Sequence, residues 1–361
     1  MVRSEVRVLF DAHWWCDGPP SGRGILRAAI LTWLHDYPDD SLVLRAPRAD
    51  LPRIRADLAA EGLAVELRPV GRWARVPALT ALTSSARSVR ADAVVTQNFT
   101  ALGGGGVKAA FVYDALFTDH PEWFTRGERL YFSLITASSR RADVVIANTD
   151  AERQRMLRAW PWLRGRITVA PVPVPRGLAR AAPVRPAIVP EVAGEFILSV
   201  GRLNARKNLA HLVDGFLASR RSASTTLYIV GSADGLTSDF LSGRDHGGRV
   251  VPTGSLSDGE LRWMYENSGL FVFPSLAEGF GMPLVEAASF GAPSIASDIA
   301  PFREIGLSQS YFDPTSIAAI ADAIDGAVLR SAAPPQTPAQ FTWSSFVSTV
   351  RSRILEVSAG G

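Results

Sequence analysis

The feature that most constrains the fold is a repeated alternation of short apolar runs with amphipathic stretches. In the first half of the chain the apolar runs are VRVLF, SLVLRAP, AVELRPV, DAVVTQ, AAFVYD and DVVIANT, and segments with helical periodicity separate several of them. Near-continuous apolar strands that alternate with helices are typical of parallel sheets covered on both faces. The sequence therefore predicts an α/β fold.

The alternation stops at a proline-rich segment and then begins again. PVPVP at positions 171–175 opens an Ala/Arg/Pro-rich stretch to about Glu195, which we expect to be an extended linker because proline fixes φ and lacks an amide donor. FILSVG, TLYIVG, RVVPTG, LFVFPS and APSIAS then restart the pattern. We predict domains at residues 1–177 and 178–340, and a last helix at 341–361 that packs back on the first domain. Ligands of such sheets bind at the carboxyl ends of the strands, so the two domains would face each other across a cleft.

Composition excludes several classes of function. The single cysteine, Cys16, leaves no internal disulfide and no multi-cysteine zinc site. The 38 basic and 35 acidic residues are interspersed, unlike the basic stripe of a protein that binds nucleic acid. The sequence has no apolar run of about 18 residues, and its first residues lead directly into a strand-like stretch, so we expect a cytoplasmic protein.

A cationic segment follows the first strand of the second half. Lysine occurs only twice in the chain, and one of the two, Lys207, lies in FILSVGRLNARKNLAHLV with Arg202 and Arg206. Asn208 can cap the helix that follows. Cations beside a helix N-terminus favour an anion such as a diphosphate, because free amides and the helix dipole act in the same direction. A solvated basic loop would show the same pattern, so both interpretations stay open for this segment alone.

A second segment, LFVFPSLAEGFGMPLVEAASFGAPSIAS, carries a stronger signal. An apolar strand leads into a loop that contains Glu278, and Pro283 lies in the first turn of a helix that bears Glu286. The glycines between them allow the backbone to approach a ligand closely. Each carboxylate can accept two hydroxyl hydrogen bonds, which suits the diol of a ribose or a hexose. A glutamate near a helix N-terminus also interacts favourably with the dipole, so Glu286 alone is modest evidence.

The motifs of the second half occur in a familiar order. GRLNARKN, VGSADG, TGSLSDGEL, PSLAEGFGMPLVEA and GAPSIASD resemble those of the retaining GT-B glycosyltransferases of family four, the group 1 glycosyltransferases. The resemblance implies two Rossmann-like parallel-sheet domains facing a central cleft, the first for the acceptor and the second for a nucleotide-sugar donor. It also implies transfer of a hexose to a glycan or lipid-linked acceptor with retention of configuration, as in polysaccharide or glycoconjugate biosynthesis.

The resemblance assigns roles to individual residues of the second half. Arg202 and Lys207 would bind the donor diphosphate, and Glu286 would bind the nucleotide ribose. Glu278 would hold the transferred sugar. Backbone groups would complete the donor site, those of Gly279, Phe280, Gly281 and Met282 at the sugar and those of Ser255 and Leu256 at the base.

The first half resembles the family less closely. FDAHWWCDGPPSGRGILRAAI is similar to its first strand and glycine-rich loop, which implies that Gly22 and Gly24 approach the donor phosphates, although a simple turn is the alternative. AAFVYDALFTDHPEWF lies where many relatives carry a His-Asp pair whose histidine contacts the donor sugar. Here the pair is Tyr113-Asp114, which puts the histidine's role in doubt, although a tyrosine hydroxyl could bind the sugar. We interpret His120 as a turn residue.

The expected chemistry is stabilisation of a leaving diphosphate. Fixed cations and amides can supply it. We therefore expect no metal and no cofactor beyond the nucleotide sugar, since the sequence also lacks the Asp-x-Asp triplet that holds divalent ions in the other large glycosyltransferase fold. Asp114 is a conceivable nucleophile for a two-step reaction. A front-face route, in which the leaving phosphate accepts the acceptor's proton, fits the residues better.

Other interpretations remain open. The G-x-G-x-x-G turn of a dinucleotide-dependent oxidoreductase is absent from the sequence. A GT-B sugar-nucleotide epimerase, which needs no acceptor, and a catalytically degenerate binding subunit remain as alternatives. GDP-mannose, UDP-hexoses and dTDP-rhamnose all suit such a donor site. Trp14, Trp15, Trp73 and the arginines near them could rest on anionic lipid at the inner membrane face, but buried tryptophans and a solvated helix explain the same residues.

Overall fold

A computed structural model of the chain describes residues 5–71, 76–191, 195–232, 240–330 and 340–360. The chain divides into two compact units. The N-terminal unit comprises Met1–Asp119, Arg126–Pro175 and Gln340–Gly361, and the C-terminal unit comprises His120–Thr125 and Arg176–Ala339. The sequence had placed the corresponding boundaries at 177 and 340.

Seven described strands of the N-terminal unit form a parallel sheet in the order β3-β2-β1-β4-β5-β6-β7. The strands are β1 Arg7–Asp11, β2 Ser41–Pro47, β3 Glu66–Val70, β4 Ala93–Gln97, β5 Val107–Phe111, β6 Val144–Ala147 and β7 Ile167–Val169. The helices are α1 Pro20–Asp36, α2 Leu51–Ala60, α3 Pro77–Leu82, α4 Leu116–Asp119, α5 Arg126–Ser139, α6 Asp150–Ala159 and α13 Trp343–Gly360. The strand order reverses between β1 and β4, which is where open α/β sheets bind ligands.

Helices cover both faces of this sheet because its strands are apolar on both sides. On one face, the ring of Phe10 in β1 lies 5.5 Å from Trp33 of α1, and the ring of Phe111 in β5 lies 5.6 Å from Phe346 of α13. On the other face, Ala110 of β5 belongs to a core cluster that contains residues of α3, α5 and α6. The last helix thus packs on the N-terminal sheet, although it follows the C-terminal unit in sequence.

Six described strands of the C-terminal unit form a second parallel sheet in the order β10-β9-β8-β11-β12-β13. They are β8 Phe196–Val200, β9 Thr226–Val230, β10 Val250–Gly254, β11 Leu270–Phe273, β12 Ser294–Ser297 and β13 Ser310–Phe312. The helices are α7 Arg176–Arg180, α8 Leu209–Ala218, α9 Asp258–Asn267, α10 Met282–Ser289, α11 Ala300–Ile305 and α12 Ile317–Gly326. Here the strand order reverses between β8 and β11.

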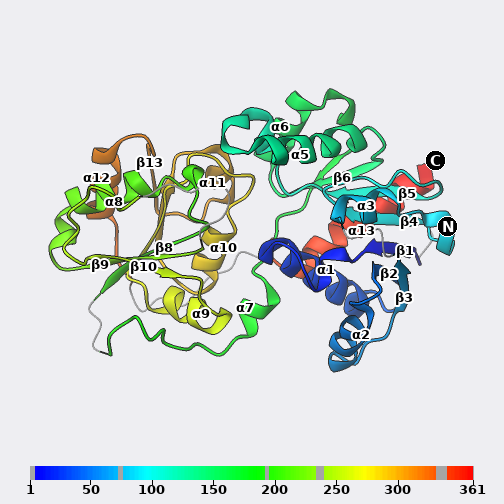
Figure 1. Cartoon of the computed structure of the whole chain (residues 1–361), viewed down its shortest axis with the longest axis horizontal. Helices are drawn as coiled ribbons and strands as arrows, with labels where there is room; N and C mark the ends of the chain where they lie inside the picture. The colour runs from blue at the N-terminus through cyan, green and yellow to red at the C-terminus, as the bar shows by residue number, and fades with distance from the viewer. Residues whose placement is uncertain (1–4, 72–75, 192–194, 233–239, 331–339, 361) are drawn as a thin grey trace. The chain divides into compact units, whose positions relative to one another are not determined.

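Alternate residues of β8 face opposite layers of helices. Ile197 packs in one cluster with Leu212 of α8 and Ile320 of α12. Its neighbour Phe196 stacks on Trp263 of α9, with ring centroids 6.2 Å apart. Figure 1 shows α8 and α12 together on one side of the sheet and α9 on the other. This alternation is the period of two that a strand imposes, and it leaves the carboxyl ends of the strands to the loops.

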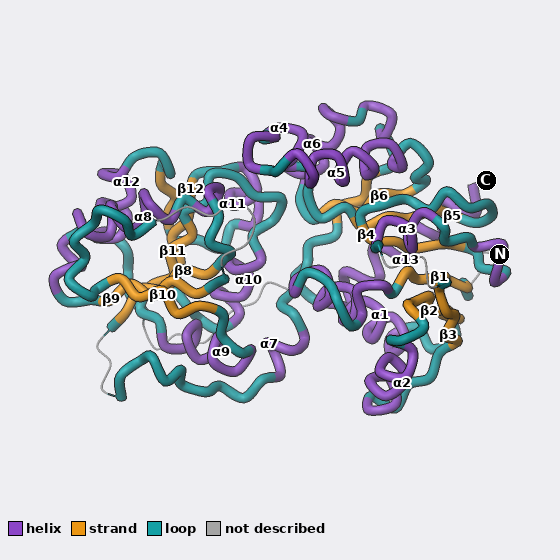
Figure 2. The backbone as a smooth tube through the Cα atoms, viewed as in Figure 1, coloured by secondary structure: helices purple, strands orange, loops and turns teal. Residues whose placement is uncertain are grey.

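The sequence correctly predicted two parallel α/β sheets. The linker prediction was wrong in one respect, because the stretch from Pro171 contains the short helix α7. Beyond α7 the chain runs to residue 191 without a helix or strand (Figure 2). Trp73, the second half of VGSADG and the stretch Pro334–Pro338 lie outside the described residues. In the part of the chain that the structure describes, no helix has the length and apolar content needed to span a bilayer.

Candidate functional site

The candidate site of the C-terminal unit is built on the loops after β8 and β11, the two strands at the reversal of strand order. The amide of Leu276 donates a 2.8 Å hydrogen bond to the carbonyl of Arg206, which joins the two loops. Asn208 adopts a left-handed conformation with φ 57° before α8. Its side-chain amide donates to the carbonyls of Pro274 and Pro314, at 3.2 and 2.6 Å. Asn208 was expected to cap α8, but its side chain ties three loops together instead.

A buried ion cluster lies where these loops meet. Glu278 is 7% exposed and accepts hydrogen bonds from Lys207 at 2.6 Å, from Arg206 at 2.5 Å and from Ser275 at 2.8 Å. Burial opposes ionisation of this carboxyl, but the charges of Arg206 and Lys207 prevail and lower its pKa to about 2. Glu278 is therefore a carboxylate at every physiological pH, held in one position by three donors.

Lys207 is the central cation of the cluster. It is buried, and its ammonium lies 4.6 Å from the centroid of the Phe273 ring, a cation–π contact. Burial lowers the pKa of Lys207 to about 8, while the charge of Glu278 acts in the opposite direction. Arg202 is exposed, and its charge also acts on Lys207. Arg206 and Lys207 contact the Glu278 carboxylate, and Arg202 adds a third positive charge near Lys207. The resulting excess of positive charge suits an anionic ligand.

The glycines of this site have packing roles. Gly281, at the start of α10, has φ 132°, and a Cβ there would lie 2.8 Å from the ring of Phe302. A Cβ on Gly231 would lie 1.8 Å from the carbonyl oxygen of Gly201, so the loops after β8 and β9 meet backbone to backbone. These close approaches require glycine whether or not a ligand is bound.

Glu286 occupies the second half of the motif. It lies on α10, is 7% exposed, and accepts a 2.8 Å hydrogen bond from the hydroxyl of Tyr265 in α9. Burial raises the pKa of Glu286 to about 7, although the bond from Tyr265 lowers it. Lys207 acts electrostatically on both Glu278 and Glu286, so the two carboxyls share one neighbourhood. Their charge states differ near neutral pH, because only Glu278 is strongly paired.

Ser255 and Leu256 connect β10 to α9. Both precede Ser257, whose side chain caps α9: it accepts a 3.3 Å hydrogen bond from the amide of Glu260, and the Glu260 carboxylate accepts a 3.0 Å bond from the amide of Ser257. This capping box fixes the backbone at the start of α9. Ser255 is exposed and Leu256 is half-buried.

The N-terminal unit places the predicted glycines in a helix, not in a loop. Gly22 and Gly24 lie in the first two turns of α1, which begins at Pro20. A Cβ on Gly22 would lie 2.7 Å from the indole ring of Trp14, whereas one on Gly24 would make only an ordinary 3.6 Å contact with Pro175. Packing against Trp14 therefore explains the glycine at 22. The approach of both glycines to donor phosphates stays a prediction from the resemblance.

Tyr113 lies two residues after the end of β5 and stacks on the same tryptophan. The Tyr113 and Trp14 rings have centroids 5.7 Å apart and an interplanar angle of 28°. The Tyr113 hydroxyl donates a short hydrogen bond to the side-chain carbonyl of Gln97, at the end of β4. Burial raises the pKa of Tyr113, so the phenol stays neutral and keeps its proton. The Gln97 amide nitrogen has no hydrogen-bond partner among the described residues.

Asp114 is held by its own loop. Its carboxylate accepts a 3.3 Å hydrogen bond from the amide of Leu116, at the start of α4. The next amide, that of Ala115, donates at 2.6 Å to Glu152, a fully buried residue that also pairs with Arg155. Burial raises the pKa of Glu152 to about 7, although the charge of Arg155 opposes this. Glu152 thus anchors the backbone that carries Tyr113 and Asp114.

Sequence reasoning missed several polar residues of these edges. Asp11 ends β1, is 2% exposed, and has its pKa raised by burial to about 7, against the amide of His13 and the charge of Arg45. A polar residue at the carboxyl end of an apolar strand was a visible signal for Asp11, and likewise for Gln97. Tyr265 gave no such signal, because an aromatic residue in an amphipathic helix is ordinary core.

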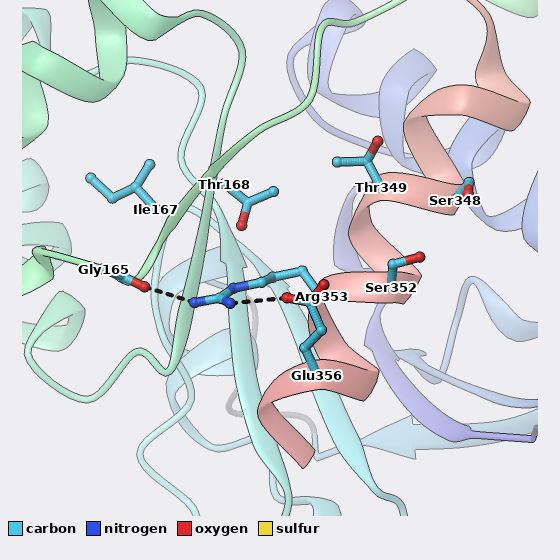
Figure 3. A pocket seen from close by; sticks show the side chains of 8 residues that line it. All are labelled: Gly165, Ile167, Thr168, Ser348, Thr349, Ser352, Arg353 and Glu356. Atoms are coloured by element: carbon cyan, nitrogen blue, oxygen red, sulfur yellow. Dashed lines mark hydrogen bonds and ion pairs between the residues drawn. The ribbon is translucent and has the colours of Figure 1, made fainter. Parts of the chain in front are cut away.

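A separate groove of about 630 Å³ lies in the N-terminal unit between β7 and α13. Figure 3 shows Arg353 of α13 reaching toward the carbonyl of Gly165, to which it donates at 2.7 Å. The groove is lined by Gly165, Ile167, Thr168, Ser348, Thr349, Ser352, Arg353 and Glu356. Since no residue predicted from the sequence lines it, this groove is not part of the candidate site.

The segment that carries the ion cluster matches a known protein family. The family described as glycosyl transferases group 1 matches residues 185–337, which contain every predicted site residue of the C-terminal unit. The family described as Glycosyltransferase Family 4 matches residues 21–176. The chain belongs to the group 1 glycosyltransferases. The two matches together span more than half of the chain, so the predictions of family and of a glycosyltransferase are confirmed.

The curated relatives that the chain matches share only part of their length with it. A "Serotype-specific mannosyltransferase WbdA" of Escherichia coli is 30% identical over 168 residues, which cover 42% of this chain and 20% of that protein. An "O-antigen chain mannosyltransferase B" of Escherichia coli is 26% identical over 201 residues, which cover 53% of this chain and 51% of that protein. The chain thus aligns with about half or less of the length of these relatives.

Solved structures confirm the GT-B fold. A structure of WaaG, a glycosyltransferase involved in lipopolysaccharide biosynthesis, matches with a TM-score of 0.60 at 16% identity and covers 98% of this chain and 100% of that one. A lipopolysaccharide outer core galactosyltransferase, WaaB, matches with a TM-score of 0.60 at 17% identity and covers 98% and 99% of the two chains. At such identities the likeness concerns the fold.

Proposed function

We propose that this group 1 glycosyltransferase moves a mannosyl residue from a nucleotide-diphosphate sugar to a glycan or lipid-linked acceptor in the synthesis of a bacterial polysaccharide. The observation that carries the proposal is the buried cluster of Glu278, Arg206 and Lys207 at the reversal of strand order in the C-terminal sheet. Two relatives that are named mannosyltransferases support mannose among the hexoses.

The donor diphosphate binds to the cationic side of the cluster. Arg202 and Lys207 neutralise charge that grows on the diphosphate as the anomeric bond breaks, and such stabilisation lowers the barrier. Arg206 holds Glu278 and adds to the positive field. Protein cations supply this charge, so the proposal needs no metal ion.

The nucleoside and the sugar bind to the two carboxyls. Glu286 accepts hydrogen bonds from the ribose hydroxyls, and the backbone at Ser255 and Leu256 contacts the base. Glu278, a carboxylate fixed by Arg206 and Lys207, accepts hydrogen bonds from hydroxyls of the transferred sugar. Backbone groups of residues 279–282 complete the sugar site.

Retention of configuration is part of the proposal. In a two-step route the nucleophile would be Asp114, whose carboxylate accepts a 3.3 Å hydrogen bond from the Leu116 amide of its own loop. A front-face route instead lets the departing phosphate accept the proton of the acceptor hydroxyl. The roles of Gly22, Gly24 and Tyr113 toward the donor stay predictions from the resemblance.

Calorimetric binding tests the proposal. GDP-mannose, UDP-glucose, ADP-glucose and dTDP-rhamnose are titrated into the wild-type chain, into Glu286→Ala and into the control Glu191→Ala, whose side chain is 88% exposed. We expect one nucleotide class to bind, Glu286→Ala to abolish that binding, and Glu191→Ala to leave it unchanged. The proposal fails if no sugar nucleotide binds or if Glu286→Ala binds as well as the wild type. Preference for another sugar overturns only the mannosyl assignment.

A further inference from the structure

Exposed apolar side chains gather on one surface of the N-terminal unit. Leu130, at 74%, is the most exposed large apolar side chain in the described part of the chain. Four others belong to the same surface: Val76 at 44%, Leu79 at 39%, Leu102 at 49% and Leu134 at 41%. We call these five residues the α3–α5 surface. We propose that the α3–α5 surface docks the protein on an anionic phospholipid bilayer.

The five residues belong together because α3 and α5 pack side by side. Ala78 of α3 and Ile135 of α5 belong to one core cluster, and a hydrogen bond joins Tyr131 of α5 to the backbone of Ala78. The amide of Leu102 donates at 2.9 Å to the carbonyl of Leu82, which places Leu102 at the end of α3. Both helices bury one face in this common core against the sheet. Their opposite faces, which carry the exposed apolar residues, therefore point outward on the same side of the sheet.

Leu130 and Leu134 form the centre of the surface. They lie four residues apart on α5, so their side chains occupy the same face of the helix. Neither covers a neighbouring hydrophobic residue in the core clusters, whereas the opposite face of α5 contributes Ile135 and Tyr131 to the core. A helix with apolar residues on both faces needs a second apolar environment for the outer one.

The charged residues at the ends of α5 indicate which apolar environment covers its outer face. Arg126 and Arg129 lie at the start of α5, and Arg140 and Arg141 directly follow its end, all four exposed. The helix contains one acidic residue, Glu128, which is half-buried. The guanidinium of Arg140 lies over the Trp162 ring, 3.8 Å from its centroid, which leaves the other three as the arginines closest in sequence to the exposed leucines. Exposed leucines with exposed arginines beside them match the boundary between acyl chains and anionic headgroups, where the leucines leave water and the arginines meet phosphate.

The position of this surface differs from the sequence expectation. Trp14 and Trp15 were candidates for membrane contact, but they are 7% and 0% exposed. The indole nitrogen of Trp15 donates at 2.9 Å to Asp57, inside the unit. Trp73 lies outside the described residues. The tryptophans named from the sequence therefore give no lipid-facing surface in the described structure, and α5 supplies the apolar and cationic groups instead.

Vesicle co-sedimentation of the full chain tests the proposal. Vesicles of phosphatidylcholine alone are compared with vesicles that also contain phosphatidylglycerol. The test variant is Leu130→Gln with Leu134→Gln, and the matched control is Ile317→Gln with Val328→Gln, which changes two exposed apolar residues of the C-terminal unit. A third variant, Arg126→Gln with Arg129→Gln, removes charge without touching the leucines.

We expect the wild type and the control to bind the anionic vesicles, and added salt to weaken that binding. The leucine variant should bind at least about tenfold more weakly, since transfer of a leucine from water to an apolar phase changes an equilibrium by roughly that factor or more. The arginine variant should lose its preference for anionic over neutral vesicles. Binding of the sugar nucleotide by calorimetry should be unchanged in all variants, which shows that they are folded and that the donor site is independent of this surface.

Three outcomes would overturn the proposal. The first is no sedimentation of the wild type with anionic vesicles, and the second is equal binding by the leucine variant and the control. The third is that sedimentation velocity without lipid shows the wild type as an oligomer and the leucine variant as a monomer. The surface would then be an interface between copies of this chain.

Discussion

Tyr265→Phe removes the one hydroxyl that the structure places on Glu286. The ring of Tyr265 is fully buried, and it stacks on Phe290 with centroids 6.0 Å apart, so phenylalanine should keep the packing. The loss is a single 2.8 Å hydrogen bond to a buried carboxylate. Hydrogen bonds to charged groups contribute roughly 1.5–3 kcal/mol. Since one pKa unit corresponds to about 1.4 kcal/mol, the pKa of Glu286 should rise by about one to two units.

The direction of the effect follows from the role that we propose for the Glu286 carboxylate, which is to bind the ribose. Ribose hydroxyls donate hydrogen bonds, so only ionised Glu286 accepts two of them. Burial already raises the pKa of Glu286 to about 7, and nucleotide binding by the wild type should therefore strengthen as the pH rises through about 7. Binding should weaken again as Lys207 loses its proton, because burial lowers its pKa to about 8. In Tyr265→Phe the acidic limb of this profile moves to higher pH and the basic limb stays.

Calorimetric dissociation constants for the preferred nucleoside diphosphate, measured between pH 5.5 and pH 9, provide the assay. At pH 7.5 the ionised fraction of Glu286 falls about 3- to 25-fold when its pKa rises by one to two units, and affinity should fall by the same factor. Tyr311→Phe is the matched control, since the Tyr311 hydroxyl donates to the carbonyl of Phe302 at 3.1 Å and not to Glu286. An acidic limb at the same pH in Tyr265→Phe and the wild type would refute the reasoning.

Three further predictions concern glycine, burial and the ion cluster. Gly231→Ala should lower the free energy of unfolding by about 3 kcal/mol or more in a denaturant titration, because its Cβ would lie 1.8 Å from the Gly201 carbonyl oxygen. Gly62→Ala, with φ 71° and open space, should cost only about 1 kcal/mol. Burial raises the pKa of Asp11 to about 7, so its contribution to stability is present below its ordinary pKa of 3.8 and is lost as the pH rises through 7. At pH 8 the free energy of unfolding of Asp11→Asn, from a denaturant titration, should therefore exceed that of the wild type by up to about 4 kcal/mol, whereas near pH 4 the two should be equal. The same difference between variant and wild type at both pH values would contradict this. Glu278→Gln should bind inorganic pyrophosphate at least as tightly as the wild type in calorimetry but transfer sugar about a hundredfold more slowly or worse. If pyrophosphate affinity and transfer rate fell by the same factor, Glu278 would act on the diphosphate and not on the sugar.

The fold was predictable because its determinants are local. Each apolar run named from the sequence overlaps a parallel strand, and Pro283 lies in the first turn of α10 where proline is tolerated. The helix α7 was missed because a five-residue helix in a stretch rich in proline and arginine has too few periodic positions to show. Asn208 was misassigned for a different reason. Its side chain bonds to Pro274 and Pro314, and nothing in the local sequence shows that those carbonyls are near.

The candidate donor site was predictable to the level of residue names but not of charge states. Lys207 and Glu278 could be named from motifs, whereas their direct ion pair joins residues on two loops that only the sheet brings together. The pair lowers the pKa of Glu278 to about 2. Glu286 has no ion pair with a cation among the described residues, and burial raises its pKa to about 7. Eight residues of sequence thus separate two glutamates with opposite pKa shifts, and the difference comes mainly from neighbours that are distant in sequence.

Tyr113 is interpreted differently from the sequence and from the structure. Taken alone, a tyrosine in place of the family's histidine suggests loss of function. In the structure Tyr113 belongs to a fitted group: Trp14 stacks on it, Gly22 leaves room for Trp14, and the Gln97 side-chain carbonyl accepts a hydrogen bond from its hydroxyl. A site released from selection would keep such mutual fit only by chance, since any larger residue at 22 would collide with the indole. The substitution is therefore better explained as one part of a repacked edge of the N-terminal sheet than as decay, and this favours an active transferase over a degenerate binding subunit.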